Sequence, residues 1–368
     1  MPLFPSHPAC VHPYFGFRSD TTLRLTARAL RARRPSFEPG GRWRAVRTLL
    51  TQYASHEVAG LPVTLELEAP DGTRHSFDTT TDKEGYARFD LTLPQEWPLP
   101  ADPAWEIGTL HWRNDEGPQT ADAPILVPGT ATRLAVISDI DDTIIETGIT
   151  GGLRSLARNW RRIFAHLPDE RSAVPGADAF YGALGGGSVR LEGDHTGDRL
   201  PATHRPFFYV SSSPWNLFGY LVAFKQAKGL PLGPMMLRDW GLNRATLGSG
   251  SHGAHKVEAI RRILSTYPDL RFALIGDDTQ GDLPAFAGIA EQARHAIAAI
   301  FIRKAATDDL SAEEIEAKTV IESLGIPLWV GPSYDIGRDF LRAVGFTPGG
   351  ETERLVEAVE EEAEEAEA

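Results

Sequence analysis

The sequence has almost no cysteine and no long hydrophobic run. Its 368 residues include one cysteine, Cys10, which excludes an internal disulfide and a thiolate metal cluster and fits a reducing compartment. The apolar run at 296–302 is far too short to cross a bilayer, so we expect no transmembrane segment. The first residues lack a basic region followed by an apolar stretch, so we expect no signal peptide and a cytoplasmic protein.

The sequence also has fewer basic than acidic residues. The formal net charge is −13, which argues against the binding of nucleic acid. Nine glutamates and one arginine fall within residues 351–368, so the last segment, 348–368, is predicted to be an acidic solvating tail. A tail that binds a partner is the alternative. The apolar content of 42% and charged content of 24% are typical of a globular protein, and the length is enough for two domains.

Residues 1–129 are predicted to form a β-rich domain. Several segments alternate apolar and polar residues with period two, which is typical of strands with one buried face. Turn signals separate them, and short antiparallel strands at regular spacing indicate a sandwich-like domain. One helix is expected at 43–54. The expected strands are 23–30, 63–68, 86–93, 107–112 and 125–127.

Residues 130–347 show a different pattern, after a boundary at 128–130. Short, continuous apolar segments are typical of strands buried on both faces, and helical segments lie between them. This alternation predicts a doubly wound α/β domain with a parallel sheet and a site at the carboxyl ends of the strands. The expected strands are 134–137, 207–210, 272–275 and 298–302, and the expected helices include 153–164, 215–228 and 256–265.

The strand expected at 134–137 leads into a group of carboxylates. Asp139, Asp141 and Asp142 follow it directly, and the hydroxyl of Thr143 comes next. Carboxylates crowded at the end of a buried strand repel one another unless a cation lies among them or one of them holds a proton. Both conditions suit phosphoryl transfer, in which one carboxylate attacks phosphorus, a neighbour carries the proton and Mg²⁺ neutralises charge.

Three further motifs follow in order along the chain. A run of serines, 211–213, comes after the strand expected at 207–210. Lys256 begins a helix after a loop of glycine, serine and histidine. The strand at 272–275 is followed by Gly-Asp-Asp-Thr-Gln-Gly-Asp, which contains Asp277 and Asp282.

This order of motifs resembles the haloacid-dehalogenase-like (HAD-like) phosphatase superfamily. The series Asp-Ile-Asp-Asp-Thr-Ile-x-x-Thr, Val-Ser-Ser-Ser-Pro-Trp, Leu-Arg-Asp-Trp-Gly, His-Lys and Leu-Ile-Gly-Asp is similar to the phosphatidate phosphatase family of fungal actin patches and many bacteria. The resemblance covers roughly residues 130–345, and the β-rich segment fits that family's architecture. It implies an HAD-like fold and Mg²⁺-dependent hydrolysis of a phosphomonoester through an aspartyl-phosphate.

The resemblance also implies roles for single residues. Asp139 would be the nucleophile, and Asp141 would protonate the leaving oxygen and then deprotonate the attacking water. Lys256 would neutralise charge on the nucleophile and the phosphoryl group.

Other residues would bind the phosphate and the metal. Ser211 is favoured as the phosphate ligand because it is nearer the strand, with Ser213 as the alternative and Thr143 as a further phosphate-binding hydroxyl. The oxygen-only ligands suit Mg²⁺ rather than Zn²⁺. The implied metal residues are Asp139, Asp141 through its backbone carbonyl, Asp277, and Asp282 in the outer shell or through water.

One motif departs from the family pattern. Asp278 stands where the family usually has serine, and a later Glu and Tyr are missing, although both outer acids are kept. The expected substrate is phosphatidate, taken from a membrane surface and converted to diacylglycerol. A soluble phosphorylated metabolite or a macromolecule is the alternative substrate, and a non-catalytic adaptor is the alternative to an enzyme.

Overall fold

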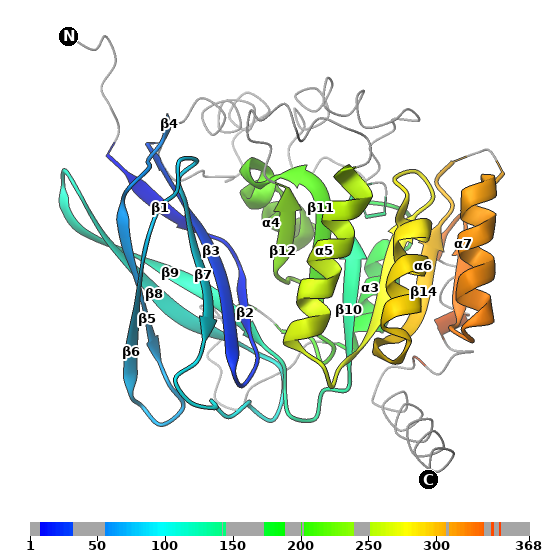
Figure 1. Cartoon of the computed structure of the whole chain (residues 1–368), viewed down its shortest axis with the longest axis horizontal. Coiled ribbons are helices and arrows are strands. Elements are labelled where there is room, and N and C mark those ends of the chain that lie inside the picture. Colours follow the sequence, from blue (N-terminus) through cyan, green and yellow to red (C-terminus); the bar gives the residue numbers. More distant parts are fainter. Residues whose placement is uncertain are drawn as a thin grey trace.

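A computed structural model gives the fold of most of the chain (Figure 1). The helices expected at 43–54 and 153–164 and the acidic tail lie outside the described residues. The described residues are 8–31, 56–141, 143–144, 173–187, 200, 202–238, 251–306, 309–334, 340–341 and 346.

The N-terminal part forms a sheet of nine strands, more than the sequence pattern indicates. The strands run in the order β1-β3-β2-β9-β8-β5-β6, and β4 and β7 both pair with β3. The two strands expected at 107–112 and 125–127 are the middle and end of one long hairpin, β8–β9. The bounds are β1 Cys10–Pro13, β2 Gly16–Arg18, β3 Thr22–Arg31, β4 His56–Glu57, β5 Pro62–Glu68, β6 Arg74–Thr80, β7 Tyr86–Thr92, β8 Ala104–Asn114 and β9 Gly117–Val127.

This sheet folds over onto itself, so the predicted sandwich is two layers of one hydrogen-bonded sheet. Strand β2 connects the layers, because it pairs antiparallel with β3 and parallel with β9. Leu25 and Phe89 from one layer share a buried core with Leu65 and Leu110 from the other. The period-two pattern places these side chains on the inner faces.

The C-terminal part contains a parallel sheet of six strands in the order β12-β11-β10-β13-β14-β15. The chain starts in the middle at β10, builds outwards to β12, and then returns to the other side of β10 with β13. The strand order therefore reverses between β10 and β13, which is where open α/β sheets bind ligands. The bounds are β10 Leu134–Asp139, β11 Phe207–Pro214, β12 Met235–Arg238, β13 Arg271–Asp277, β14 Ile297–Arg303 and β15 Leu328–Gly331.

Helices cover both faces of the parallel sheet, as a doubly wound arrangement requires. Leu134 and Val136 of β10 belong to the core under α3 and α4, whereas Ala135 and Ile137 belong to the core under α5, α6 and α7. The continuous apolar character of β10 follows from this burial on both faces. The helix bounds are α3 Ala177–Gly185, α4 Phe218–Ala227, α5 Ser251–Thr266, α6 Asp282–Gln292 and α7 Ala312–Ser323, with short 3-10 helices at Trp215–Leu217 and Arg294–Ala296.

Strand β11 differs from its expected end. It continues to Pro214 instead of ending at 210, so the serine run is part of the strand rather than of the loop after it. The pairing with β12 shifts register between Val210 and Pro214, which marks an irregularity at the serines. The domain boundaries at 129 and 347 stay predictions.

The folded-over sheet packs beside α5 and the edge of the parallel sheet (Figure 1). The Phe17 ring meets the Phe208 ring edge-on at 5.5 Å between centroids. Tyr267 donates a buried hydrogen bond to the backbone oxygen of Arg18 at 3.1 Å. Apolar and polar contacts therefore join the two parts of the chain.

None of the helices in the described part of the chain has the length and apolar content needed to span a membrane.

The buried face of α5 gives a direct test of the core. Ile260 is 1% exposed, whereas Ile315 of α7 is 54% exposed. Ile260→Ala is expected to lower the free energy of unfolding by about 2–5 kcal/mol because it removes packed methyl groups and leaves a cavity. Ile315→Ala, the matched control, is expected to change it by less than about 0.5 kcal/mol. Urea unfolding measures both, and equal losses would contradict this core.

Candidate active site

The site forms where neighbouring parallel strands end. Asp139 is the last residue of β10 and Asp277 is the last residue of β13. The register pairs Ser138 with Ile275, so the two aspartates leave the same edge of the sheet. Sequence order predicts this meeting, because parallel strands bring their carboxyl ends together.

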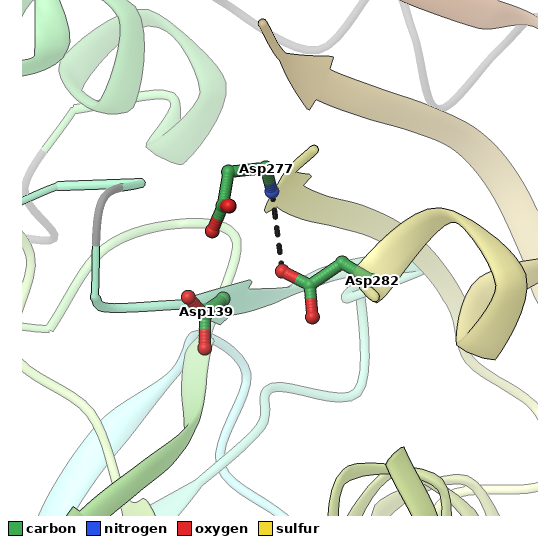
Figure 2. A group of neighbouring side chains, drawn as sticks. All are labelled: Asp139, Asp277 and Asp282. Atoms are coloured by element: carbon green, nitrogen blue, oxygen red, sulfur yellow. Dashed lines mark hydrogen bonds between the residues drawn. The ribbon is translucent and has the colours of Figure 1, made fainter. Parts of the chain in front are cut away.

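Asp282 completes a buried acidic triad with these two residues (Figure 2). One carboxylate oxygen from each residue lies within 4.8 Å of the others, and all three side chains are buried. Asp282 begins α6, and its Oδ2 accepts a hydrogen bond from the backbone N–H of Asp277 at 3.1 Å. Gly276 makes this approach possible, because a Cβ there would lie 2.5 Å from Asp282 Oδ2.

Lys256 of α5 supplies the positive charge for this triad. Its Nζ lies 3.0 Å from Asp139 Oδ1 and also donates to Asp282 Oδ1. The lysine is 2% exposed, so this ion pair is shielded from water. Both oxygens of Asp282 thus have partners, which makes Asp282 a support for the lysine as well as a member of the acidic triad.

One lysine does not balance the triad. Burial raises the pKa of Asp139 well above its ordinary value, against the opposing charge of Lys256, and the neighbouring carboxylates add to the rise. Burial and then Asp282 raise the pKa of Asp277 to about 7. Burial disfavours the charge of Lys256, but Asp139 and Asp282 outweigh it and raise the lysine's pKa. The excess negative charge and the oxygen-only donors are compatible with a divalent cation.

Thr143 lies between two of the acids. Its Oγ1 donates to Asp277 Oδ2 at 3.1 Å and lies 3.4 Å from Asp139 Oδ2. On the other side, the backbone N–H of Thr279 donates to Asp277 Oδ1 at 2.6 Å. The hydroxyl expected to bind phosphate therefore orients the acidic triad here.

Asp141 is held apart from the triad by the two serines. Ser211 Oγ donates to Asp141 Oδ2 at 2.6 Å, and Ser213 Oγ lies 3.0 Å from the same oxygen. The backbone N–H of Ser213 also donates to Ser211 Oγ at 2.9 Å, which ties the serines together. The two candidates for the phosphate ligand thus share one partner. The backbone carbonyl of Asp141 accepts a hydrogen bond from Gln280 Nε2 at 3.3 Å.

Sequence reasoning missed a set of hydroxyl groups next to the backbone of Asp139 and Thr143. Ser138 Oγ donates to the backbone oxygen of Asp139 at 2.6 Å and lies 2.7 Å from the Tyr181 hydroxyl. Tyr334 donates to the backbone oxygen of Thr143 at 3.1 Å. These buried bonds fix both ends of the turn that carries the acids. No local pattern could have revealed them, since Tyr181 and Tyr334 look like ordinary core residues in the sequence.

Asp278, the residue that departs from the family pattern, has a partner outside the triad. Its Oδ1 accepts hydrogen bonds from the backbone N–H groups of Ala305 at 2.7 Å and Ala306 at 3.0 Å. It therefore anchors the loop after β14.

Comparisons with known proteins agree with the motif pattern. Residues 134–304 match the family model described as "Phosphatidate phosphatase APP1, catalytic domain". Phosphatidate phosphatase APP1 of Saccharomyces cerevisiae is 29% identical over 266 residues, which cover 68% of this chain. The matched part spans only 39% of that relative's own length. The predicted resemblance to the actin-patch type of phosphatidate phosphatase family is confirmed for the catalytic domain.

Solved structures match less well. A Bifidobacterium dentium beta-glucuronidase covers 92% of this chain and 58% of its own, with 8% identity and a TM-score of 0.27. The PilB minor pilin of Streptococcus sanguinis covers 77% of this chain and 86% of its own, with 7% identity and a TM-score of 0.25. TM-scores of this size do not indicate a shared fold.

Removal of the buried lysine tests the charge balance of the site. Lys256→Met is expected to lower the free energy of unfolding by about 3–5 kcal/mol, because it leaves buried carboxylates without a partner. Without the lysine the pKa values of Asp139 and Asp277 rise further in the folded state, because its charge lowers both. A raised carboxyl pKa favours folding at low pH and loses this effect as pH rises, so the loss should be larger at pH 8 than at pH 5.

Lys318→Met is the matched control for this change. The Lys318 side chain is 44% exposed, and its Nζ lies 3.6 Å from Glu322 Oε1 on α7. Its removal is therefore expected to lower the free energy of unfolding by less than about 1 kcal/mol. Urea unfolding in a chelator at both pH values measures the two variants. If Lys256→Met lowers the free energy of unfolding less at pH 8 than at pH 5, the charge balance of the acidic triad is contradicted.

Proposed function

We propose that this chain is a Mg²⁺-dependent phosphatase that hydrolyses a phosphomonoester through an aspartyl-phosphate on Asp139, with phosphatidate as the first-choice substrate. The observation that carries the proposal is the separation of carboxylates at one sheet edge. Asp139 lies in a charged triad beside Lys256, whereas Asp141 accepts hydrogen bonds from two serine hydroxyls. Two carboxyl groups in different surroundings suit two different roles, nucleophile and general acid.

The acidic triad supports the assignment of a divalent cation. Asp139 and Asp277 would hold Mg²⁺ together with the backbone carbonyl of Asp141, which faces the loop that follows β13. Asp282 would act from the outer shell, since Lys256 and the backbone of Asp277 take its oxygens. When bound, the ion would supply positive charge to the phosphoryl oxygens and keep the nearby carboxylates ionised.

The first half of the reaction uses both members of the Asp-x-Asp pair. An oxygen of Asp139 attacks phosphorus, and the bond from phosphorus to the leaving oxygen breaks. Asp141 gives its proton to that oxygen, so the alcohol leaves without negative charge. Lys256 favours the ionised form of Asp139 before the attack and neutralises charge on the phosphoryl group during it.

The second half returns the enzyme to its starting state. Asp141, now a carboxylate, takes a proton from water as the water oxygen attacks phosphorus. The bond from Asp139 to phosphorus breaks and inorganic phosphate leaves. Ser211 and Ser213 both bind Asp141 in the absence of substrate. In the reaction one hydroxyl would turn to a phosphoryl oxygen while the other keeps Asp141 oriented.

The family supports phosphatidate as substrate, because the curated relative is a phosphatidate phosphatase. We infer that an HAD-like domain within 130–347 would act on this lipid from a cytoplasmic membrane surface. A soluble phosphomonoester or a phosphorylated macromolecule is the second candidate, since the same chemistry serves any phosphomonoester. The buried lysine and four aspartates argue against a non-catalytic adaptor, because an adaptor gains nothing from burying mutually repelling charges.

Phosphate release tests the proposal directly. The wild type is expected to release phosphate from phosphatidate in mixed micelles with Mg²⁺, to lose activity in a chelator, and to regain it when Mg²⁺ is returned. Asp139→Asn is expected to lower the rate by at least ~10³-fold, because the substituted amide cannot attack phosphorus. Asp269→Asn changes an exposed aspartate just before the first residue of β13, whereas Asp277 is the last residue of that strand, and it is expected to keep the rate.

A panel of soluble phosphomonoesters, assayed in parallel, separates the substrate classes. Release from soluble esters alone would keep the mechanism and reject the lipid. Full activity of Asp139→Asn would reject the aspartyl-phosphate, and no release from any substrate would favour the adaptor.

A further inference from the structure

The N-terminal sheet contacts the chain directly after the site serines. We define residues 211–216 as the serine segment. The Tyr14 ring stacks on Trp215, with centroids 4.3 Å apart and planes at 22°. Arg28 Nη1 donates to Asn216 Oδ1 at 2.5 Å. Both contacts act within three residues of Ser213, which holds the general acid.

Arg28 is itself held rigidly by its own sheet. Its Nε donates to the backbone oxygen of Glu84 at 3.0 Å, and its Nη2 reaches Glu57 Oε1 at 3.3 Å. The guanidinium lies over the Tyr86 ring at 4.6 Å from the centroid, and the residue is 8% exposed. A planar guanidinium with so many partners has one orientation available, so Asn216 meets a fixed donor.

Tyr14 is fixed in a similar way. Its backbone N–H donates to the backbone oxygen of Thr26 in β3 at 3.0 Å. The ring also packs on Phe218 at the start of α4, with centroids 4.8 Å apart. The aromatic contact thus spans the end of the serine segment and the beginning of the next helix.

We propose that the N-terminal sheet positions the catalytic acid. Tyr14 and Arg28 hold the end of the serine segment, so that Ser211 and Ser213 keep the Asp141 carboxylate in place. Neither residue touches substrate, and both are positioning residues. The role of Asp141 in this inference rests on the proposed function. The contact between the N-terminal sheet and the serine segment is independent of that function.

The expected effect on catalysis follows from the hydrogen bonds to Asp141. A displaced acid transfers its proton poorly, and a misplacement of about 1 Å can cost ~10²-fold in rate. Proton transfer belongs to the chemical step, so the loss is expected in kcat rather than in KM.

Two variants release the serine segment from the sheet, namely Asn216→Ala and Tyr14→Ala. Each is expected to lower kcat for phosphatidate about tenfold or more and to change KM less than about twofold. The loss should be smaller for p-nitrophenyl phosphate, whose leaving oxygen needs less protonation. Amide hydrogen exchange is expected to show weaker protection of residues 211–216 in both variants.

Three further variants serve as controls. Thr266→Ala removes a bond from Arg24, 3.2 Å long, that also joins the two parts of the chain but lies away from the serine segment. Arg88→Ala removes the other guanidinium over the Tyr86 ring, also at 4.6 Å. Both are expected to keep wild-type protection and kcat. Asn216→Asp keeps an acceptor for Arg28 and is expected to restore both.

The two readouts separate this inference from the proposed function. Unchanged protection of residues 211–216 in Asn216→Ala and Tyr14→Ala overturns the inference, whatever the wild type hydrolyses. Weaker protection with unchanged kcat in an active enzyme overturns the positioning role. Weaker protection in a chain that hydrolyses no phosphomonoester supports the contact and rejects the proposed function.

Discussion

The repulsion among buried carboxylates at the ends of β10 and β13 is the constraint on which the rest of the site depends. Asp139, Asp277 and Asp282 lie close together, and Lys256 forms ion pairs with Asp139 and Asp282. Burial keeps water from screening these charges, so each neighbouring group must either oppose the negative charge or orient it. The glycine at 276, the threonine hydroxyls and the start of α6 all serve this purpose.

Two sets of hydrogen bonds place the aspartates of the site in two different environments, the acidic triad and the position of Asp141. Thr143 donates into the acidic triad, while Ser211 and Ser213 bind Asp141 from the neighbouring strand. The division matters because a nucleophile must be ionised and a general acid must carry a proton in the same step. The irregular pairing of β11 with β12 occurs at these serines, so the strand carries hydroxyl groups into the site.

The N-terminal sheet shares part of its packing with the parallel sheet and its helices. Phe17 lies in the same core as Phe208 and the inner face of α5, and Tyr14 and Arg28 reach the end of the serine segment. Phe17 belongs to β2, Arg28 belongs to β3, and Tyr14 lies between β1 and β2. The layer that contains β1 and β3 is therefore the one that contacts the parallel sheet. The folded-over sheet thus contributes both to the stability of the parallel sheet and to the order of its site.

The sequence by itself determined the central strands of the parallel sheet, the edge at which Asp139 and Asp277 emerge, and the resemblance to the phosphatidate phosphatase family. The spacing of apolar residues and the order of motifs can be read from the sequence alone, because a strand that is buried on both faces is a continuous apolar run. Only the tertiary structure decided that the N-terminal strands form one folded-over sheet, that both serines hold Asp141, and that Asp282 supports Lys256. These pairings join residues far apart in the chain, and their geometry follows from packing that no local pattern encodes.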